Sequence, residues 1–286
     1  MIACDLGSNT IRFVEIDCKS KTRVKEYEKI VRTAEGIKSS GVIGDSAKRR
    51  VFEALSEASE IFDFSKGVKA VTTEALRVAK NADEFLGEIK RRFGIEFKII
   101  DGKKEAFYTN VAVKNIVDTK SYILVDIGGG STEVSFVDGE EIVSHSFDLG
   151  IVTIVEEYGI KDLKKGISEK ISLIKESFKE YQKPSLLVAT SGTPTTIASY
   201  LLGMDYENYD YKKINGLILS LKEVQKVKND LIFMSEKERK KWVGVGREDL
   251  IVAGIEIFEE LIKLFEFKKC VVVDDSLREG VAIFHC

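Results

Sequence analysis

Two stretches of this chain, 121 residues apart, repeat one pattern: an apolar run ending in Asp, a turn of small residues, and a second apolar-rich run. The first copy contains Asp5 and the second contains Asp126. Each copy predicts two strands joined by a tight turn. The repeat predicts two lobes whose turns face one another across a cleft. Backbone N–H groups of such turns can hold phosphate oxygens, and the Asp at each strand end can hold a cation. The pattern therefore predicts a phosphate-binding cleft.

The composition indicates an ordinary folded protein and excludes several enzyme classes. The chain has 286 residues, 44% hydrophobic and 32% charged, with two Pro and no apolar run of 18 residues. These values argue against disorder and against a membrane span, and the length allows two domains. A net charge of −3 provides no general attraction for DNA or membranes. Only two His are present, and a GxxxxGK[ST] motif is absent, which excludes HExxH zinc enzymes and Walker-type NTPases.

The four cysteines, Cys4, Cys18, Cys270 and Cys286, show no C-x-x-C spacing. The N-terminus begins with an apolar strand and lacks the pattern of a secretory signal. We therefore expect reduced thiols and a cytoplasmic protein.

Hydrophobic periodicity predicts an α/β chain in which strands and helices alternate after an opening three-stranded meander. The third strand of the first half is expected at 23–31. The second half repeats the meander and then adds helices and buried strands. The expected helices are 46–62, 83–93, 103–116, 152–158, 168–181, 197–202, 221–233, 237–242, 247–265 and a closing helix from 277.

Seven motifs occur in order along nearly the whole chain, at 5–10, 73–81, 105–106, 126–133, 149–150, 191–193 and 277–280. Together they resemble the motifs of the exopolyphosphatase/guanosine pentaphosphate phosphatase (Ppx/GppA) family. The resemblance implies two duplicated ribonuclease-H-like domains of the actin, Hsp70 and sugar-kinase superfamily, with an interdomain cleft. The family's division implies a first domain at 1–114 together with the closing helix 277–286, and a second at 115–276. Long members carry an additional helical, HD-like C-terminal region, and this chain resembles the short form without it.

The resemblance implies that Glu105 is the general base that activates the attacking water. The residues alone leave open an acid at a helix N-terminus, favoured by the helix dipole. Family members usually have two acidic residues here, whereas this chain has Lys104 before Glu105. Asp126 and Glu133 are implied to hold Mg²⁺ or its waters, a role that suits hard oxygen ligands. The alternative is a turn cap for Asp126 and a Lys partner for Glu133.

The residues expected to bind phosphate come from both turns and from one arginine. An Arg binds phosphate oxygens bidentately and keeps its charge. Arg12 is either a second clamp or a partner of Glu15 or Glu133, while Arg247 and Arg278 are interpreted as structural or interlobe ion-pair residues. Where the family has Gly-Gly-Thr, this chain has Ser at 191, and the segment is expected to line the cleft or to start a helix. The phosphate-binding set is Asp5, Gly7, Ser8, Asn9, Arg77, Gly128, Gly129, Gly130, Ser131 and Thr132.

Together these features imply an Mg²⁺-dependent phosphoanhydride hydrolase. Its substrate would be inorganic polyphosphate, with short chains preferred and orthophosphate released, or the 5′-γ-phosphate of guanosine pentaphosphate. The alternatives are a superfamily ATPase or kinase, and a non-catalytic sensor of polyphosphate or an alarmone. The expected partner is thus polyphosphate or a guanosine polyphosphate nucleotide, with no DNA and no membrane. A homodimer is common in the family, and no stripe in this sequence decides it.

Overall fold

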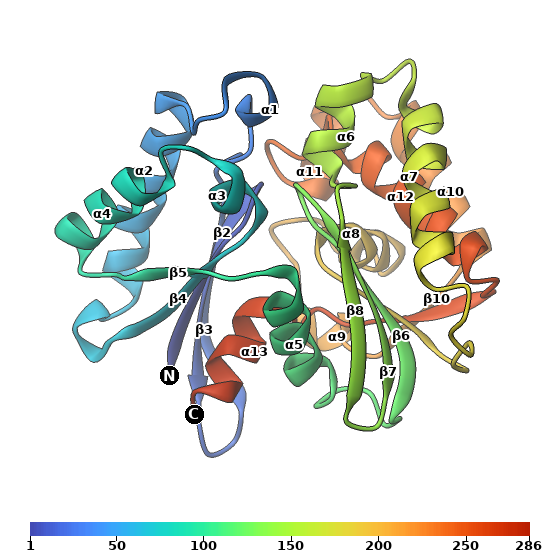
Figure 1. Ribbon diagram of the computed structural model, residues 1–286, viewed down its shortest axis with the longest axis horizontal. Helices are drawn as coiled ribbons and strands as arrows, with labels where there is room; N and C mark the ends of the chain where they lie inside the picture. Colours follow the sequence, from blue (N-terminus) through green and yellow to red (C-terminus); the bar gives the residue numbers. More distant parts are fainter. The chain divides into compact units, whose positions relative to one another are not determined.

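The computed structural model describes residues 1–286 and divides into two compact units. Unit 1 is Met1–Val113 with Ser276–Cys286, and unit 2 is Lys114–Asp275. These limits differ by one residue from the domain limits expected from the sequence. Each unit contains one mixed β-sheet with helices packed on it (Figure 1).

Unit 1 is built on a five-stranded sheet of order β3-β2-β1-β4-β5. Strand β1 is antiparallel to β2 and parallel to β4, so the opening hairpin leads into a parallel half of the sheet. In Figure 1, α2 and α4 lie on one side of this sheet, and α5 and α13 lie on the other. The strands are β1 Ile2–Leu6, β2 Thr10–Asp17, β3 Thr22–Ile30, β4 Val68–Thr72 and β5 Phe97–Ile99. The helices are α1 Ile37–Ser40, α2 Asp45–Ile61, the 3₁₀ turn η1 Phe64–Lys66, α3 Glu74–Val78, α4 Ala82–Phe93, α5 Gly102–Val113 and α13 Leu277–Phe284.

Unit 2 repeats this topology and adds one strand at the edge. Its sheet order is β10-β11-β9-β6-β7-β8, with β6 antiparallel to β7 and parallel to β9. Apart from β10, the order corresponds strand for strand to that of unit 1. The duplicated ribonuclease-H-like fold implied by the family resemblance is therefore confirmed. The strands are β6 Ser121–Ile127, β7 Thr132–Asp138, β8 Glu141–Phe147, β9 Leu187–Thr190, β10 Leu217–Ser220 and β11 Lys269–Val272. The helices are α6 Ile151–Tyr158, α7 Leu163–Ser177, α8 Gly192–Leu201, α9 Tyr211–Ile214, α10 Leu221–Phe233, α11 Glu236–Val243 and α12 Ile251–Leu264.

Several local predictions differ from the structure. The helix expected at 168–181 runs over Leu163–Ser177, and the short helices α1, α3 and α9 were not expected. Strand β10 was not expected, because it has only four residues and one of them, Ile218, is apolar but exposed. So short a run shows no clear hydrophobic period. Helix α8 begins at Gly192 and not at 197, since Pro194 is tolerated in a first helical turn. Helix α12 begins at Ile251 and not at 247, because residues 247–250 form turns. In these turns the backbone carbonyl of Arg247 accepts hydrogen bonds from the N–H groups of Leu250 and Ile251.

The returning helix α13 packs against α5 with almost no space between the two backbones. A Cβ added at Gly280 would lie 1.8 Å from the carbonyl oxygen of Tyr108. Around this contact, Leu277, Val281 and Ala282 join a buried cluster with residues of β1, β2 and α5. The chain therefore returns to unit 1 after completing unit 2. Gly280 makes the close packing of the returning helix possible, because it has no side chain.

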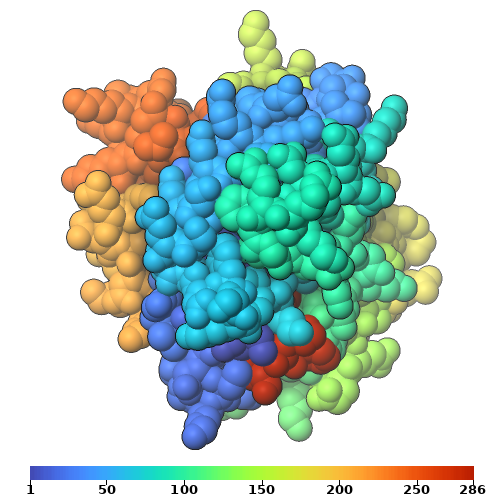
Figure 2. Space-filling model, turned by 90° about the vertical axis from the view of Figure 1, so that its left-hand side faces the viewer, coloured from blue at the N-terminus to red at the C-terminus, as the bar shows by residue number.

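A disulfide joins Cys18, in the turn between β2 and β3, to the C-terminal Cys286. Figure 2 shows the red C-terminal segment beside the dark blue hairpin of unit 1. The expectation that all four cysteines are reduced is wrong for this pair, because residues 268 positions apart meet only in the folded chain. Cys4 and Cys270 are free and buried. Since disulfides are rare in reducing compartments, the cytoplasmic location expected from these thiols loses that support. No helix has the length and apolarity needed to span a membrane.

Candidate active site

The turn of the second copy, residues 128–131, is held in place by the start of helix α6. The N–H of Gly128 donates to the carbonyl of Ser131 at 2.9 Å, which closes the turn. The carbonyls of Gly128 and Gly129 accept the N–H groups of Ile151 and Val152 at 3.0 and 2.8 Å. The first N–H groups of α6 would otherwise lack partners, so the turn and the helix satisfy one another.

Close packing allows only one arrangement of this turn. A Cβ added at Gly150 would lie 2.3 Å from the Gly129 carbonyl oxygen. The Thr153 hydroxyl donates to the Gly130 carbonyl at 2.9 Å, and the Thr132 hydroxyl donates to the Leu149 carbonyl. The carbonyls of the three glycines thus accept hydrogen bonds from α6, while the Ser131 carbonyl closes the turn. Its remaining N–H groups are then the groups of the turn that can bind an anion.

The two carboxylates expected to hold a metal stand opposite one another on adjacent strands. Asp126 and Glu133 are register partners in the β6–β7 ladder, so their side chains leave the same face of the sheet. Both are buried. Glu133 accepts hydrogen bonds from Ser131 at 2.7 Å and Ser146 at 2.6 Å, and Asp126 accepts one from Ser191. Two serine hydroxyls therefore hold the Glu133 carboxylate from its own turn and from strand β8.

This donor set fits Mg²⁺. Magnesium in proteins is commonly held by one or two carboxylates, with water and phosphate oxygens completing its shell. No group of three or more His, Cys, Asp or Glu side chains in the chain is arranged as a metal site. Asp126 and Glu133 would therefore hold such an ion together with its waters and its substrate.

The turn of the first copy has the same geometry with different side chains. The N–H of Gly7 donates to the Thr10 carbonyl at 2.9 Å, as Gly128 does to Ser131. The carbonyls of Ser8 and Asn9 accept N–H groups from the segment after β3. The Asn9 side-chain oxygen is buried and accepts no hydrogen bond. A buried amide of this kind needs a partner, and a bound water or ligand at this turn would supply one.

Asp5 and Arg12 occupy the positions in unit 1 that correspond to Asp126 and Glu133 in unit 2. Asp5 is buried and pairs in register with Arg12 across the β1–β2 ladder. The Arg12 guanidinium forms an ion pair with Glu28 at 2.9 Å. Glu28 is the register partner of Arg12 on β3, the strand next to it in the sheet, and it had not been expected as a partner. The first copy thus presents one carboxylate where the second presents two.

Glu105 lies in the first turn of α5 and is 9% exposed. The Arg77 guanidinium contacts its carboxylate at 3.1 Å. Arg77 also donates to the Ile100 carbonyl at 2.6 Å and binds Glu74 through two nitrogens, at 3.1 and 2.8 Å. The two residues predicted separately, one as a base and one as a phosphate clamp, are therefore neighbours in unit 1.

The ion pair stabilises the cationic form of Arg77. Burial lowers the pKa of Arg77, but the charges of Glu105 and Glu74 outweigh burial, so that its pKa is raised. Arg77 therefore stays cationic beside Glu105. In this arrangement it orients the Glu105 carboxylate, and phosphate binding by Arg77 stays a prediction.

Three contacts at these sites were missed from the sequence. Ser146 could have been found, because the Asp138-Gly139 hairpin turn places it opposite Glu133. Glu74 lies one helical turn before Arg77, the spacing of an ion pair on a helix. The hydrogen bond from Ser191 to Asp126 could not be predicted from a local sequence pattern, because the two residues are 65 positions apart.

The arginines expected to have structural roles form local contacts. Arg278 binds Glu279 at 2.5 Å and Glu26 at 3.0 Å, both within unit 1. It is therefore a structural residue that closes α13 onto its own unit. Arg247 lies over the Tyr206 ring at 6.0 Å, within unit 2.

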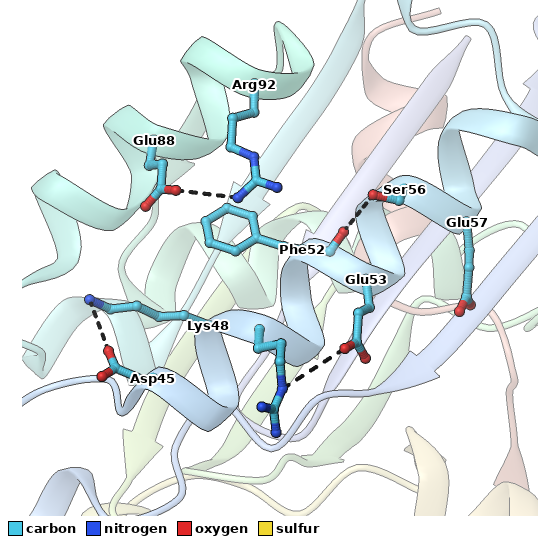
Figure 3. A pocket seen from close by; sticks show the side chains of 9 residues that line it. Asp45, Lys48, Phe52, Glu53, Ser56, Glu57, Glu88 and Arg92 are labelled. Atoms are coloured by element: carbon cyan, nitrogen blue, oxygen red, sulfur yellow. Dashed lines mark hydrogen bonds and ion pairs between the residues drawn. The ribbon is translucent and has the colours of Figure 1, made fainter.

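A separate open groove of about 650 Å³ lies between α2 and α4 (Figure 3). Arg92 stacks over Phe52 at 4.2 Å and pairs with Glu88 at 3.3 Å. Most of its other charged side chains also pair with neighbours on their own helix. None of the predicted site residues lines this groove, so it is a solvated surface apart from the candidate site.

Comparison with known proteins assigns the chain to one family. The model of the Ppx/GppA phosphatase family matches residues 14–284. The chain is 29% identical to a bifunctional 3-dehydroquinate synthase/phosphatase of Fusobacterium nucleatum, over 95% of this chain and 44% of that protein. It is 27% identical to a guanosine-5′-triphosphate,3′-diphosphate pyrophosphatase of Pseudoalteromonas translucida, over 97% and 57%. It thus spans about half the length of these two relatives.

Two further proteins are similar over almost their whole length. Exopolyphosphatase 2 of Mycobacterium tuberculosis is 26% identical, over 98% of this chain and 97% of that protein. The crystal structure of the Aquifex aeolicus Ppx/GppA family member is 29% identical, with a TM-score of 0.77, over 99% and 96%. The family match, the duplicated fold and the motif order agree, and the chain belongs to the Ppx/GppA phosphatase family.

Proposed function

We propose that this protein is a phosphoanhydride hydrolase that removes a terminal phosphate from inorganic polyphosphate or from guanosine pentaphosphate. The observation that carries the proposal is the Gly128–Ser131 turn: its three glycine carbonyls are bound to α6, and the carboxylates of Asp126 and Glu133 flank it. Relatives named for exopolyphosphatase and for guanosine pentaphosphate hydrolysis support the two substrate classes.

Each group has a chemical role in this proposal. The buried Glu105 accepts a proton from the attacking water, while Arg77 fixes its orientation. Backbone N–H groups of the turn hold the oxygens of the terminal phosphate, whose phosphorus the water oxygen attacks. The bridging P–O bond breaks, and the shortened chain or nucleotide leaves with the bridging oxygen and its negative charge. Asp126 and Glu133 would hold Mg²⁺, which supplies positive charge to the phosphate oxygens when bound. A preference for short polyphosphate chains is part of the proposal.

The test is phosphate release from polyphosphate, guanosine pentaphosphate and ATP, each incubated with the purified protein and Mg²⁺. We expect turnover of at least one of the first two and none of ATP. Glu105→Gln should lower kcat at least about 100-fold, with a smaller change in KM, because it removes the base and keeps the shape of the side chain. Glu84→Gln, an exposed acid on α4, is the matched control and should retain full activity.

The outcomes separate the possible functions. Binding of polyphosphate without any phosphate release would indicate a sensor, and turnover of ATP alone would indicate an ATPase. If wild type releases phosphate and Glu105→Gln does so at more than a tenth of that rate, the base is another residue. Thermal unfolding of both variants checks that they are folded, since Glu105 also pairs with Arg77.

A further inference from the structure

Ser191 has a backbone conformation that side chains other than glycine rarely adopt. It lies between β9 and α8, with φ 74° and ψ −177°. This region of conformational space is populated almost only by glycine, since a Cβ meets the neighbouring backbone there. A residue with a side chain persists in such a conformation when its surroundings determine it and when the strain has a use.

Helix capping does not explain the serine. Ser is a favoured N-cap residue because its hydroxyl usually accepts an N–H of the first helical turn. Ser191 is the N-cap of α8, yet its side chain forms no such bond. The position therefore combines an unfavourable backbone conformation with an unused cap, and glycine would serve the local structure better.

The hydroxyl is instead directed to the candidate site. It donates to Oδ1 of Asp126. The parallel register of β6 and β9 makes Asp126 the partner of Thr190, so the next residue, Ser191, emerges beside the carboxylate. Asp126 is 8% exposed, and a hydrogen bond to a buried charged group is stronger than one between neutral groups.

The surroundings of Ser191 hold its backbone in place. The Thr195 hydroxyl donates to the Ser191 carbonyl at 2.9 Å. On the preceding side, the Thr190 hydroxyl donates to the Asp275 carbonyl at 3.2 Å, and the N–H of Val273 donates to the Ala189 carbonyl at 3.0 Å. Bonds to α8, β11 and the segment after β11 thus fix both flanks of the strained residue.

We propose that Ser191 is a positioning residue that fixes the orientation of the Asp126 carboxylate, and that the strain in its backbone is retained for that hydroxyl. Its catalytic consequence rests on the proposed function, because Asp126 would hold the metal ion. Its structural part does not: the strain and the bond to Asp126 exist whether or not the protein turns over a substrate.

Three variants separate the hydroxyl from the strain. Ser191→Gly removes both, Ser191→Ala removes only the hydroxyl, and Ser191→Thr keeps the hydroxyl and adds a branched side chain. We expect Ser191→Gly to raise Tm by about 2 to 5 °C, because relief of strain exceeds the entropy of the added glycine. Ser191→Thr should lower Tm, because branching at Cβ is least tolerated at positive φ.

Activity should follow the hydroxyl and not the stability. Ser191→Gly and Ser191→Ala should both lower kcat for phosphate release roughly 10-fold, while Ser191→Thr keeps most of it. The matched control is Ser199→Ala on the same helix, whose buried hydroxyl donates to the Met204 carbonyl at 2.7 Å. That variant should lose stability and keep its kcat.

Crystal structures of wild type and Ser191→Ala provide a test that needs no substrate. We expect the Asp126 carboxylate to change rotamer or to become disordered in the variant. An unchanged Asp126, a Ser191→Gly protein no more stable than wild type, or equal kcat values for Ser191→Ala and wild type would each overturn the proposal. If wild type hydrolyses nothing, the proposed function fails, and Tm and the Asp126 rotamer still decide the role of Ser191.

Discussion

Glu259 is a buried carboxylate that joins helices α10 and α12. Its oxygens accept hydrogen bonds from Gln225 at 2.8 Å, from Lys263 at 2.7 Å and from Lys228. Burial raises the pKa of Glu259, but the hydrogen bonds from two lysines and Gln225 outweigh burial and lower it to about 2. The charged form is therefore the one that stabilises unit 2.

The lowered pKa predicts a dependence of stability on pH. A carboxylate whose pKa falls from 4.5 to about 2 on folding stabilises the protein fully above pH 4.5. That contribution, about 3 kcal/mol, is lost as the pH falls towards 2, because the unfolded chain then binds the proton more tightly. Denaturant unfolding between pH 6 and pH 2.5 measures it. Glu259→Gln should flatten the pH dependence, whereas Glu260→Gln, its half-exposed neighbour, should leave it unchanged. Equal slopes for wild type and Glu259→Gln would refute the assignment.

The pair Arg77–Glu105 shows why contacts were harder to predict than candidate residues. The motifs named both residues as candidates, but they did not indicate that the two are neighbours. The Arg77 guanidinium is bonded to Glu74, Glu105 and the Ile100 carbonyl. A charged side chain pairs with the groups that lie near it in the folded chain. Here those groups come from α3, α5 and the end of β5, which are separate in the sequence.

At the scale of elements, the contact between α13 and α5 is the tightest helix pairing described above. It places the helix that carries Glu105 directly against the C-terminal helix. The backbones approach so closely at Gly280 that a side chain has no room. The position of α5 therefore depends on a helix that arrives from the other end of the chain.

Gly280→Ala should destabilise unit 1 by at least about 3 kcal/mol, because the added Cβ would overlap the Tyr108 carbonyl and push α13 from α5. Gly87→Ala on α4 is the contrast, since its Cβ would meet only the tip of the Arg91 side chain at 3.6 Å. Gly87→Ala should raise the free energy of unfolding by about 0.5–1 kcal/mol, because it removes a glycine from a helix interior. Chemical denaturation of both variants measures these opposite signs. If Gly280→Ala leaves the free energy of unfolding unchanged, the two helices can move apart without loss of stability.

At the scale of the whole molecule, the disulfide ties the last residue of the chain to its first hairpin. The closed loop contains nearly the entire sequence, because the two cysteines are 268 positions apart. A cross-link of this length removes many conformations from the unfolded chain. It therefore stabilises the return of α13 to unit 1, together with the ion pairs of Arg278.

Reduction of this bond should lower the free energy of unfolding by about 2 to 5 kcal/mol. Denaturation with and without a thiol reductant measures the change, and Cys18→Ser and Cys286→Ser should each reproduce it and then show no further effect of reductant. Thiol titration of the unfolded protein should find two free cysteines before reduction and four after it. Four free thiols before reduction would show that the bond is not formed.

The sequence by itself determined the strand–turn–strand units, because period-two patterns and glycine turns act over a few residues. It also determined their duplication, and its motifs named Asp126, Glu133 and Glu105 as candidates. Only the tertiary structure decided the partners: Ser191 on Asp126, Arg77 on Glu105, Glu28 on Arg12 and Cys18 on Cys286. These contacts join residues on separate strands, helices or turns. Strand register and helix packing set such distances, and both are properties of the folded chain that no local pattern contains.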